Sequence, residues 1–159
     1  MKNRFILPLA VLLMAVSVSS CSIRINIGGF YSENPDWSVY YLGRNWDPVY
    51  GLSDYVGVSV TAGHEAYLVG WETVDEFERL GIEEVVDNWL YEYGLVLDDP
   101  FGGADSWSDL SYRGNAEIAF DVFAADEPCV AVVFGIYSNG EPTGSYAVSR
   151  PFVPGDRTF

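Results

Sequence analysis

The sequence predicts a mainly β protein, an antiparallel β-sandwich with one amphipathic α-helix inserted between its strands. Short segments of alternating apolar and polar residues recur, with Gly- and Pro-bearing turns between them, and one longer segment changes to a helical period. Strands on both sides of a single helical segment are typical of a sandwich, whereas a parallel sheet would need helices between successive strands.

The strands before the helix come in two groups. Residues 37–42 predict a strand, and residues 45–53, which include a proline and a glycine, predict a loop. Residues 55–61 and 66–71 alternate on either side of a short turn. We therefore expect the last two segments to be neighbouring strands.

A helix is predicted over about residues 73–93. Thr73 and Glu76 have the spacing of a capping box, which marks a helix start. Gly81 interrupts the helix, and Gly94 is a suitable stop. The apolar residues that recur with a helical period, and so predict a face against the domain, are Ile82, Val85, Val86, Trp89, Leu90 and Tyr93.

The last third of the chain returns to strands. A polar loop covers residues 97–111, a strand is expected at 118–123, and residues 130–137 are expected to pair with 145–152 as a hairpin. Cys129 precedes an unbroken apolar run, which predicts a small buried hydrophobic side chain. The alternative for Cys129 is a reactive thiol.

The N-terminus has the layout of an export signal, with a basic start and an apolar run too short to span a bilayer. Val18-Ser19-Ser20-Cys21 resembles the lipobox of bacterial lipoproteins, which implies cleavage before Cys21 and diacylation of that cysteine. An ordinary secretory signal and an uncleaved anchor are the alternatives. Ser22, in place of Asp, resembles the outer-membrane address of Gram-negative lipoproteins.

The predicted signal and lipidation site divide the chain into three regions. We expect residues 1–20 to be the signal peptide, residues 21–36 the lipidated N-terminus and a tether, and residues 37–159 a single domain. Without the signal, six Arg stand against 23 Asp and Glu, a formal charge of −17. Such a surface repels phosphate backbones and anionic lipid, so nucleic acid is not an expected partner. The expected partners are the membrane, through the lipid, and an envelope protein or glycan.

Catalytic motifs are scarce in the sequence. His64 is the one histidine, so the chain alone offers no His-based zinc site. No Gly-x-Ser-x-Gly elbow and no phosphate-binding loop occur, and the segment after the signal has no Lys for Schiff-base chemistry. No cofactor is predicted. A hydrolase that uses two of the many carboxylates stays as an alternative.

Aromatic residues in polar loops are the candidate ligand-binding residues, because exposed rings stack on sugars or anchor protein partners. These are Trp46 with Tyr50, and Phe101 with Trp107. Trp71 and Trp89, in contrast, lie in periodic segments, and their expected role is core packing.

The acidic loop after the helix is a candidate calcium site, because calcium prefers six to eight oxygen ligands. Its candidate ligands are Asp98, Asp99, Asp105 and Asp109. Their spacing differs from that of an EF-hand loop, and the alternative is a solvated surface loop.

Four stretches carry a family resemblance: residues 55–60, residues 67–71, the helix, and residues 130–137 with the 140–144 turn. On these stretches the chain resembles the fibronectin type III-like (immunoglobulin-like) domains of Bacteroidetes lipoproteins, over about residues 37–153. The inserted helix and the acidic loop depart from ordinary fibronectin type III domains. The resemblance implies a non-enzymatic interaction module at the cell envelope. A structural subunit of a surface complex or fimbria-like fibre is the second hypothesis, and a small carboxylate-dependent hydrolase the third.

Overall fold

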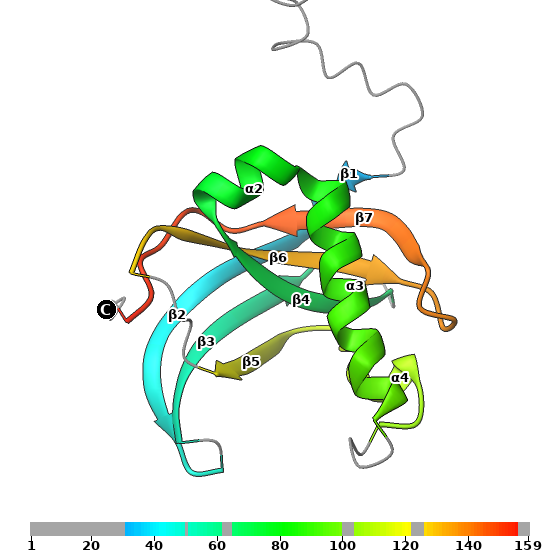
Figure 1. The fold of residues 1–159 in the computed structure, drawn as a ribbon, viewed down its shortest axis with the longest axis horizontal. Helices are drawn as coiled ribbons and strands as arrows, with labels where there is room; N and C mark the ends of the chain where they lie inside the picture. Colours follow the sequence, from blue (N-terminus) through cyan, green and yellow to red (C-terminus); the bar gives the residue numbers. More distant parts are fainter. Residues whose placement is uncertain (1–30, 50, 62–64, 100–103, 122–125, 156–159) are drawn as a thin grey trace, which may run out of the picture.

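The computed structural model describes residues 31–49, 51–61, 65–99, 104–121 and 126–155. The fold is mainly β, and its strands form two sheets, in agreement with the sequence prediction (Figure 1). The elements in chain order are β1 (Ser32–Glu33), β2 (Trp37–Asp47), β3 (Gly51–Val60), β4 (Ala66–Thr73), α2 (Val74–Leu80), α3 (Ile82–Asp98), α4 (Trp107–Leu110), β5 (Ala116–Asp121), β6 (Cys129–Ile136) and β7 (Pro142–Val148).

The strand order separates two segments that the sequence places together. One sheet has the order β1-β7-β6-β4 and the other β2-β3-β5, with all neighbours antiparallel except β1 and β7. The expectation that β3 and β4 are neighbours is therefore wrong. Alternation shows which side chains face a core, and Val58 of β3 and Val69 of β4 do face the same core, but from opposite sheets.

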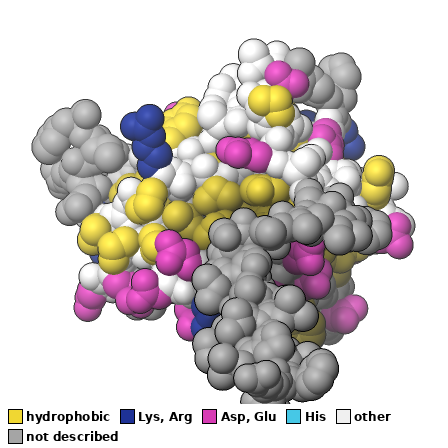
Figure 2. All heavy atoms as spheres, turned by 90° about the horizontal axis from the view of Figure 1, so that it is seen from above, with side chains coloured by type: hydrophobic (Ala, Val, Ile, Leu, Met, Phe, Trp, Pro, Cys, Tyr) yellow, Lys and Arg dark blue, Asp and Glu magenta, His cyan; other side chains and the backbone are white. Residues whose placement is uncertain are grey.

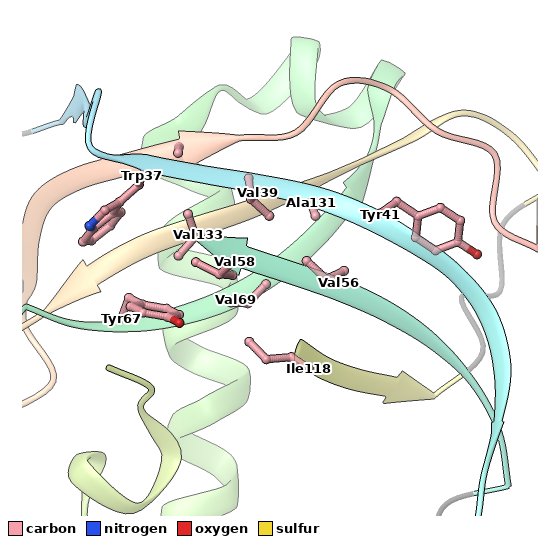
Figure 3. Packing of buried hydrophobic residues seen from close by; sticks show 11 residues of the cluster. Trp37, Val39, Tyr41, Val56, Val58, Tyr67, Val69, Ile118, Ala131 and Val133 are labelled. Carbon is pink, nitrogen blue, oxygen red and sulfur yellow. The ribbon is translucent and has the colours of Figure 1, made fainter. Parts of the chain in front are cut away.

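The main core lies between the two sheets (Figure 3). Trp37, Val39 and Tyr41 of β2 point into it, while Ser38 and Tyr40 between them are exposed, and Val56 and Val58 of β3 face the same core. The labelled residues of this cluster are Trp37, Val39, Tyr41, Val56, Val58, Tyr67, Val69, Ile118, Ala131 and Val133.

A second apolar cluster lies on the outer face of the four-stranded sheet, under α2 and α3. All eight residues of β6 are buried, because this strand has the main core on one face and the helices on the other. Burial of a side chain such as Phe134 or Leu68 contributes roughly 1.5–3 kcal/mol each. Cys129, the first residue of β6, is buried as predicted.

The helical segment begins as the sequence predicts and ends later. The Thr73 side chain accepts a hydrogen bond from the backbone N–H of Glu76, which confirms the helix start. Gly81, with φ of 79°, separates α2 from α3. The predicted stop at Gly94 is wrong, since α3 continues to Asp98. A glycine inside a helix costs about 1 kcal/mol relative to alanine, and here it weakens the helix without ending it.

The loop predicted over residues 45–53 is mostly strand. β2 continues to Asp47, and β3 already begins at Gly51, so a short turn joins them. A carboxylate oxygen of Asp47 accepts the Val49 N–H, and its other oxygen accepts the Tyr55 hydroxyl. Local side-chain hydrogen bonds of this kind allow Pro- and Gly-bearing segments to form tight turns.

The described part of the expected tether lies against the domain. β1 pairs in parallel with β7, and Tyr31 packs against the cluster under the helices. The Asn34 N–H donates to the Tyr146 carbonyl at 2.6 Å. Ordered contacts thus begin before Trp37. The signal peptide and Cys21 lie outside the described residues.

The closing hairpin of the sequence prediction is confirmed. β6 and β7 pair antiparallel, with Ile136 opposite Pro142 across the turn. β7 ends at Val148, and the following segment returns to β6 through an isolated bridge between Cys129 and Phe152. The C-terminal part of the described chain is therefore held against the main body of the sandwich.

Candidate functional site

The tip of the β2–β3 hairpin exposes three large apolar side chains. Trp46 is 75% exposed, Val49 78% and Leu52 51%. Trp46 and Leu52 are direct cross-strand partners and lie on the same side of the hairpin. We call Trp46, Val49 and Leu52 the tip surface. The sequence indicates Trp46 but not Val49 and Leu52, because the proline and glycine near the strand ends predict a loop there.

The base of the same hairpin is fixed by a buried polar cluster. Arg44 and Asp54 form a two-pronged ion pair, with nitrogen–oxygen distances of 3.1 and 2.8 Å. The Tyr41 hydroxyl also donates to Asp54 and accepts the Gly155 N–H at 2.8 Å. We call this set the polar clamp. It joins the hairpin to the C-terminal segment, where Phe152 stacks on the Tyr41 ring at 4.2 Å.

The polar clamp shifts the ionisation of its members. Burial, and then the hydrogen bond to Asp54, raise the pKa of Tyr41 to about 12. The hydrogen bond to Asp54 also raises the pKa of Arg44. Both shifts favour the protonated forms that donate to Asp54. Both donors of the clamp are therefore protonated at neutral pH, and their hydrogen bonds to Asp54 hold the part of the hairpin below the tip surface.

Of the other predicted ligand-binding aromatics, the structure describes Trp107, which does not lie beside Trp46. Trp107 begins α4 and packs against the cluster under the helices, with its ring over Gly140. A side-chain carbon added at Gly140 would lie 2.2 Å from the Trp107 ring, which shows how closely the two residues pack. Tyr50 and Phe101 lie outside the described residues. Trp71 and Trp89 pack against the two apolar clusters, as predicted.

The four candidate calcium ligands lie at the ends of two helices. Asp98 is the last residue of α3 and Asp99 its cap. The Asp109 carboxylate accepts the Asp105 N–H and the Ser106 hydroxyl, and these hydrogen bonds lower the pKa of Asp109. Within the described ranges, no cluster of three or more His, Cys, Asp or Glu side chains could hold a metal ion. The carboxylate of Asp109 serves to organise the start of α4.

A groove of about 640 Å³ lies between α3 and β5. Its α3 wall consists of Trp89, Glu92, Tyr93 and Val96. The opposite wall consists of Tyr112 and the β5 residues Ile118, Ala119 and Phe120. We call it the α3–β5 groove. The sequence does not indicate this groove, because its walls come from segments that only the fold brings together.

The polar atoms of two groove aromatics are already used by the fold. Trp89 Nε1 donates to the Trp71 carbonyl at 2.9 Å, and the Tyr93 hydroxyl donates to the Val69 carbonyl at 2.8 Å. Burial raises the pKa of Tyr93, which keeps its hydroxyl protonated. These two side chains thus present their rings to the groove, while their N–H and O–H groups donate hydrogen bonds to backbone carbonyls at the edge of β4.

Acidic residues outnumber basic ones in the chain, with 23 Asp and Glu against eight Lys and Arg. On the face that includes β1 and α2, Figure 2 shows Asp and Glu side chains around a band of hydrophobic ones. α3 and β5 contain acidic residues but no Lys or Arg. In the described portion of the chain, no helix has the length and apolar character needed to cross a membrane.

Comparison of the chain with protein-family models, with curated proteins and with solved structures found no match.

Proposed function

We propose that this chain is a lipid-anchored envelope protein whose domain binds a protein partner, without catalysis, through the tip surface. One observation carries the proposal: Trp46, Val49 and Leu52 are exposed together at the end of a hairpin whose base is fixed. Exposed apolar groups on a rigid support are typical of partner-binding sites, since little conformational entropy is lost on binding.

The position of the tip surface agrees with anchoring at the N-terminus. The hairpin tip and β1, the first described strand, lie at opposite ends of the view in Figure 1. If Cys21 carries the lipid, as the lipobox resemblance implies, the tethered chain enters the domain at the end opposite the tip surface. We assign this anchor to the outer membrane on the basis of Ser22.

A protein partner fits the tip surface better than a glycan does. Sugar sites combine a ring platform with several hydrogen-bonding groups, and Asp47, the carboxylate nearest in sequence to Trp46, is already bonded to Val49 and Tyr55. Hydrolysis of glycosides uses two carboxyl groups, and among the lining residues of the α3–β5 groove Glu92 is the one carboxylate. Both points favour binding of a protein.

We also infer that the domain is an immunoglobulin-like sandwich of the fibronectin type III kind. The supporting observation is the strand order. β2, β3 and β5 follow the order of strands A, B and E of that fold, and β4, β6 and β7 follow the order of C, F and G. The α2–α3 segment then occupies the connection between C and E.

The proposal is tested by truncation of the tip. Trp46→Ala and Leu52→Ala should each weaken binding to the principal protein that cross-links to the parent chain in envelope extracts, by roughly 30-fold for Trp46 if it is a hot spot. Tyr91→Ala, which removes another exposed aromatic ring, is the matched control and should bind like the parent.

Affinities measured with that purified partner decide the outcome. Equal affinity of Trp46→Ala and the parent would refute the tip surface as the binding site. Anchoring is tested separately with Cys21→Ser, which should lose the acyl label and leave the membrane fraction. A labelled, membrane-bound Cys21→Ser variant would contradict the lipid anchor.

A further inference from the structure

We propose that the α3–β5 groove binds an extended, positively charged peptide segment, which adds to β5 as a further strand. This site is separate from the tip surface and goes beyond the function proposed above. Edge strands present a row of backbone donors and acceptors, and an extended peptide can pair with them. Three features of the molecule support this site: the open edge of β5, the shape of the groove and its charge.

The two edge strands near the groove differ in how their backbones are satisfied. On β4, the Tyr67 N–H and carbonyl pair with Tyr112 at 3.0 and 2.9 Å, while Val69 and Trp71 receive hydrogen bonds from α3 side chains. This edge is closed. β5 pairs with β3 on one side, and no second strand in the described ranges pairs with its other side. β5 is therefore the edge that accepts a strand.

The groove beside β5 fits alternate side chains of such a strand. Side chains at positions i and i+2 lie on the same face of a strand, about 6.6–6.8 Å apart. If the peptide pairs with β5, the side chains on one of its faces would enter the groove, which has Val96 in one wall and Phe120 in the other. Phe120 meets the Trp89 ring edge to face at 6.4 Å, so one end of the groove is a fixed aromatic surface.

The groove selects apolar side chains rather than polar ligands. Trp89 Nε1 and the Tyr93 hydroxyl donate to β4 carbonyls and have no further hydrogen to offer. A ligand rich in hydroxyl groups would find few replacements here for its lost hydration, because Glu92 and Tyr112 are the other lining residues with polar side-chain atoms. A peptide instead satisfies its polar backbone along β5 and buries aliphatic or aromatic side chains.

The charge around the groove calls for a cationic partner. Glu92 lines the groove and Glu117 lies on β5. The cationic residue nearest in sequence to the groove is Arg113, which follows the wall residue Tyr112. Asp98 and Asp99 end α3, whose last turn has no basic residue. Acidic groups at a helix C-terminus add to the negative end of the helix dipole, so a bound Lys or Arg would be favourable there.

The test uses heptapeptides in which Lys alternates with Val, Leu or Phe, titrated into the full chain in detergent solution. At least one peptide should bind and slow amide hydrogen exchange at Ile118–Phe120. The same peptide with N-methyl groups on alternate residues cannot form the strand ladder, and replacement of Lys by Glu reverses its charge. Each change should weaken binding at least about tenfold, or about 1.4 kcal/mol.

Two pairs of variants locate the site on the protein. Val96→Arg fills the groove with a cation and should weaken peptide binding at least about tenfold. Leu95→Arg adds the same charge at the neighbouring exposed position outside the groove and should change affinity less than about twofold. Glu92→Lys, with Glu84→Lys as its control, provides the same contrast if Val96→Arg fails to fold.

Several results would overturn the proposal. They are no binding of any panel peptide at millimolar concentration, equal affinity for the N-methylated peptide, or equal losses in the groove variants and their controls. Binding that is lost in Trp46→Ala but kept in Val96→Arg would also overturn it, by assigning the peptide to the tip surface. Trp46→Ala with unchanged peptide affinity, in contrast, supports two separate sites.

Discussion

The two sheets share one core but are held in place by different means. The four-stranded sheet has α2 and α3 on its outer face, and aromatic side chains of α3 donate hydrogen bonds to the edge of β4. The three-stranded sheet has no helix of the described chain on its outer face, and the polar clamp joins it to the C-terminal segment. The covered sheet is the support, and the uncovered sheet carries the tip surface.

Two glycines, one in each sheet, show this difference between the covered and the uncovered sheet at single residues. Gly70, on the covered sheet, lies under the Trp89 ring, which comes from α3. Gly57, on the uncovered sheet, lies under the Tyr40 ring, which comes from the adjacent strand and is 45% exposed. In both places an aromatic ring covers a glycine of a strand. The ring over Gly70 is fixed by a helix, whereas the ring over Gly57 has solvent beside it.

The largest expected effect comes from breaking the polar clamp. Asp54 is fully buried, and Asp54→Ala removes the carboxylate that accepts from the Arg44 guanidinium and the Tyr41 hydroxyl. Loss of one partner of a buried ion pair costs 3–5 kcal/mol, and since Arg44 is 24% exposed we expect about 3 kcal/mol. Urea denaturation measures the loss in the free energy of unfolding.

Asp75→Ala, an exposed position at the start of α2, is the control for Asp54→Ala and should cost less than about 1 kcal/mol. A loss of similar size in both variants would show that the clamp does not hold the uncovered sheet. A large loss for Asp54→Ala alone would sharpen the contrast between helix-supported and clamp-supported sheets.

A smaller effect is expected from a methyl group under the Trp89 ring. In Gly70→Ala the added carbon would lie 2.5 Å from three atoms of that ring, so α3 or the strand must shift. Overpacking of this kind costs 1–3 kcal/mol, and we expect about 2 kcal/mol. Gly57→Ala places its carbon equally close to Tyr40, but this ring can rotate towards solvent, so we expect less than about 1 kcal/mol.

Gly94→Ala completes this comparison, because nothing lies within 4 Å of a carbon added there. It should stabilise α3 by about 0.5–1 kcal/mol. Thermal unfolding of the three glycine variants measures all of these differences. Equal losses in Gly57→Ala and Gly70→Ala would mean that the uncovered sheet is packed as tightly as the covered one.

The sequence predicts what depends on neighbouring residues. The helix start at Thr73 follows from its own side chain, and the break at Gly81 follows from a positive φ. Burial of Cys129 follows from the apolar run around it. The end of α3 was missed because Gly94 is a weak signal, which the flanking helical turns override.

Features that depend on distant residues were not predictable. Alternation places Val58 and Val69 in a core but does not say that they come from opposite sheets. Trp107 was expected in an open loop, yet it packs on Gly140, which only the fold brings near. Trp46 is a candidate in the sequence because it is an aromatic residue in a predicted polar loop, and the structure places it in a strand instead. Its partner Leu52 required the strand register, and the α3–β5 groove required the whole fold.

The last expected effect is absent at neutral pH, because it is a change in the alkaline stability of the clamp. Burial and the hydrogen bond to Asp54 raise the pKa of Tyr41 from 10.0 to about 12, so the folded state favours the protonated hydroxyl. This contribution is fully present below pH 10, where the unfolded side chain is also protonated, and is lost as pH rises towards 12. Tyr41→Phe has no hydroxyl to ionise, so its stability should fall less steeply between pH 10 and 12 than that of the parent. Urea unfolding at stepped pH measures how the free energy of unfolding of each protein changes with pH. Equal changes in the parent and in Tyr41→Phe would show that ionisation of the Tyr41 hydroxyl does not destabilise the fold.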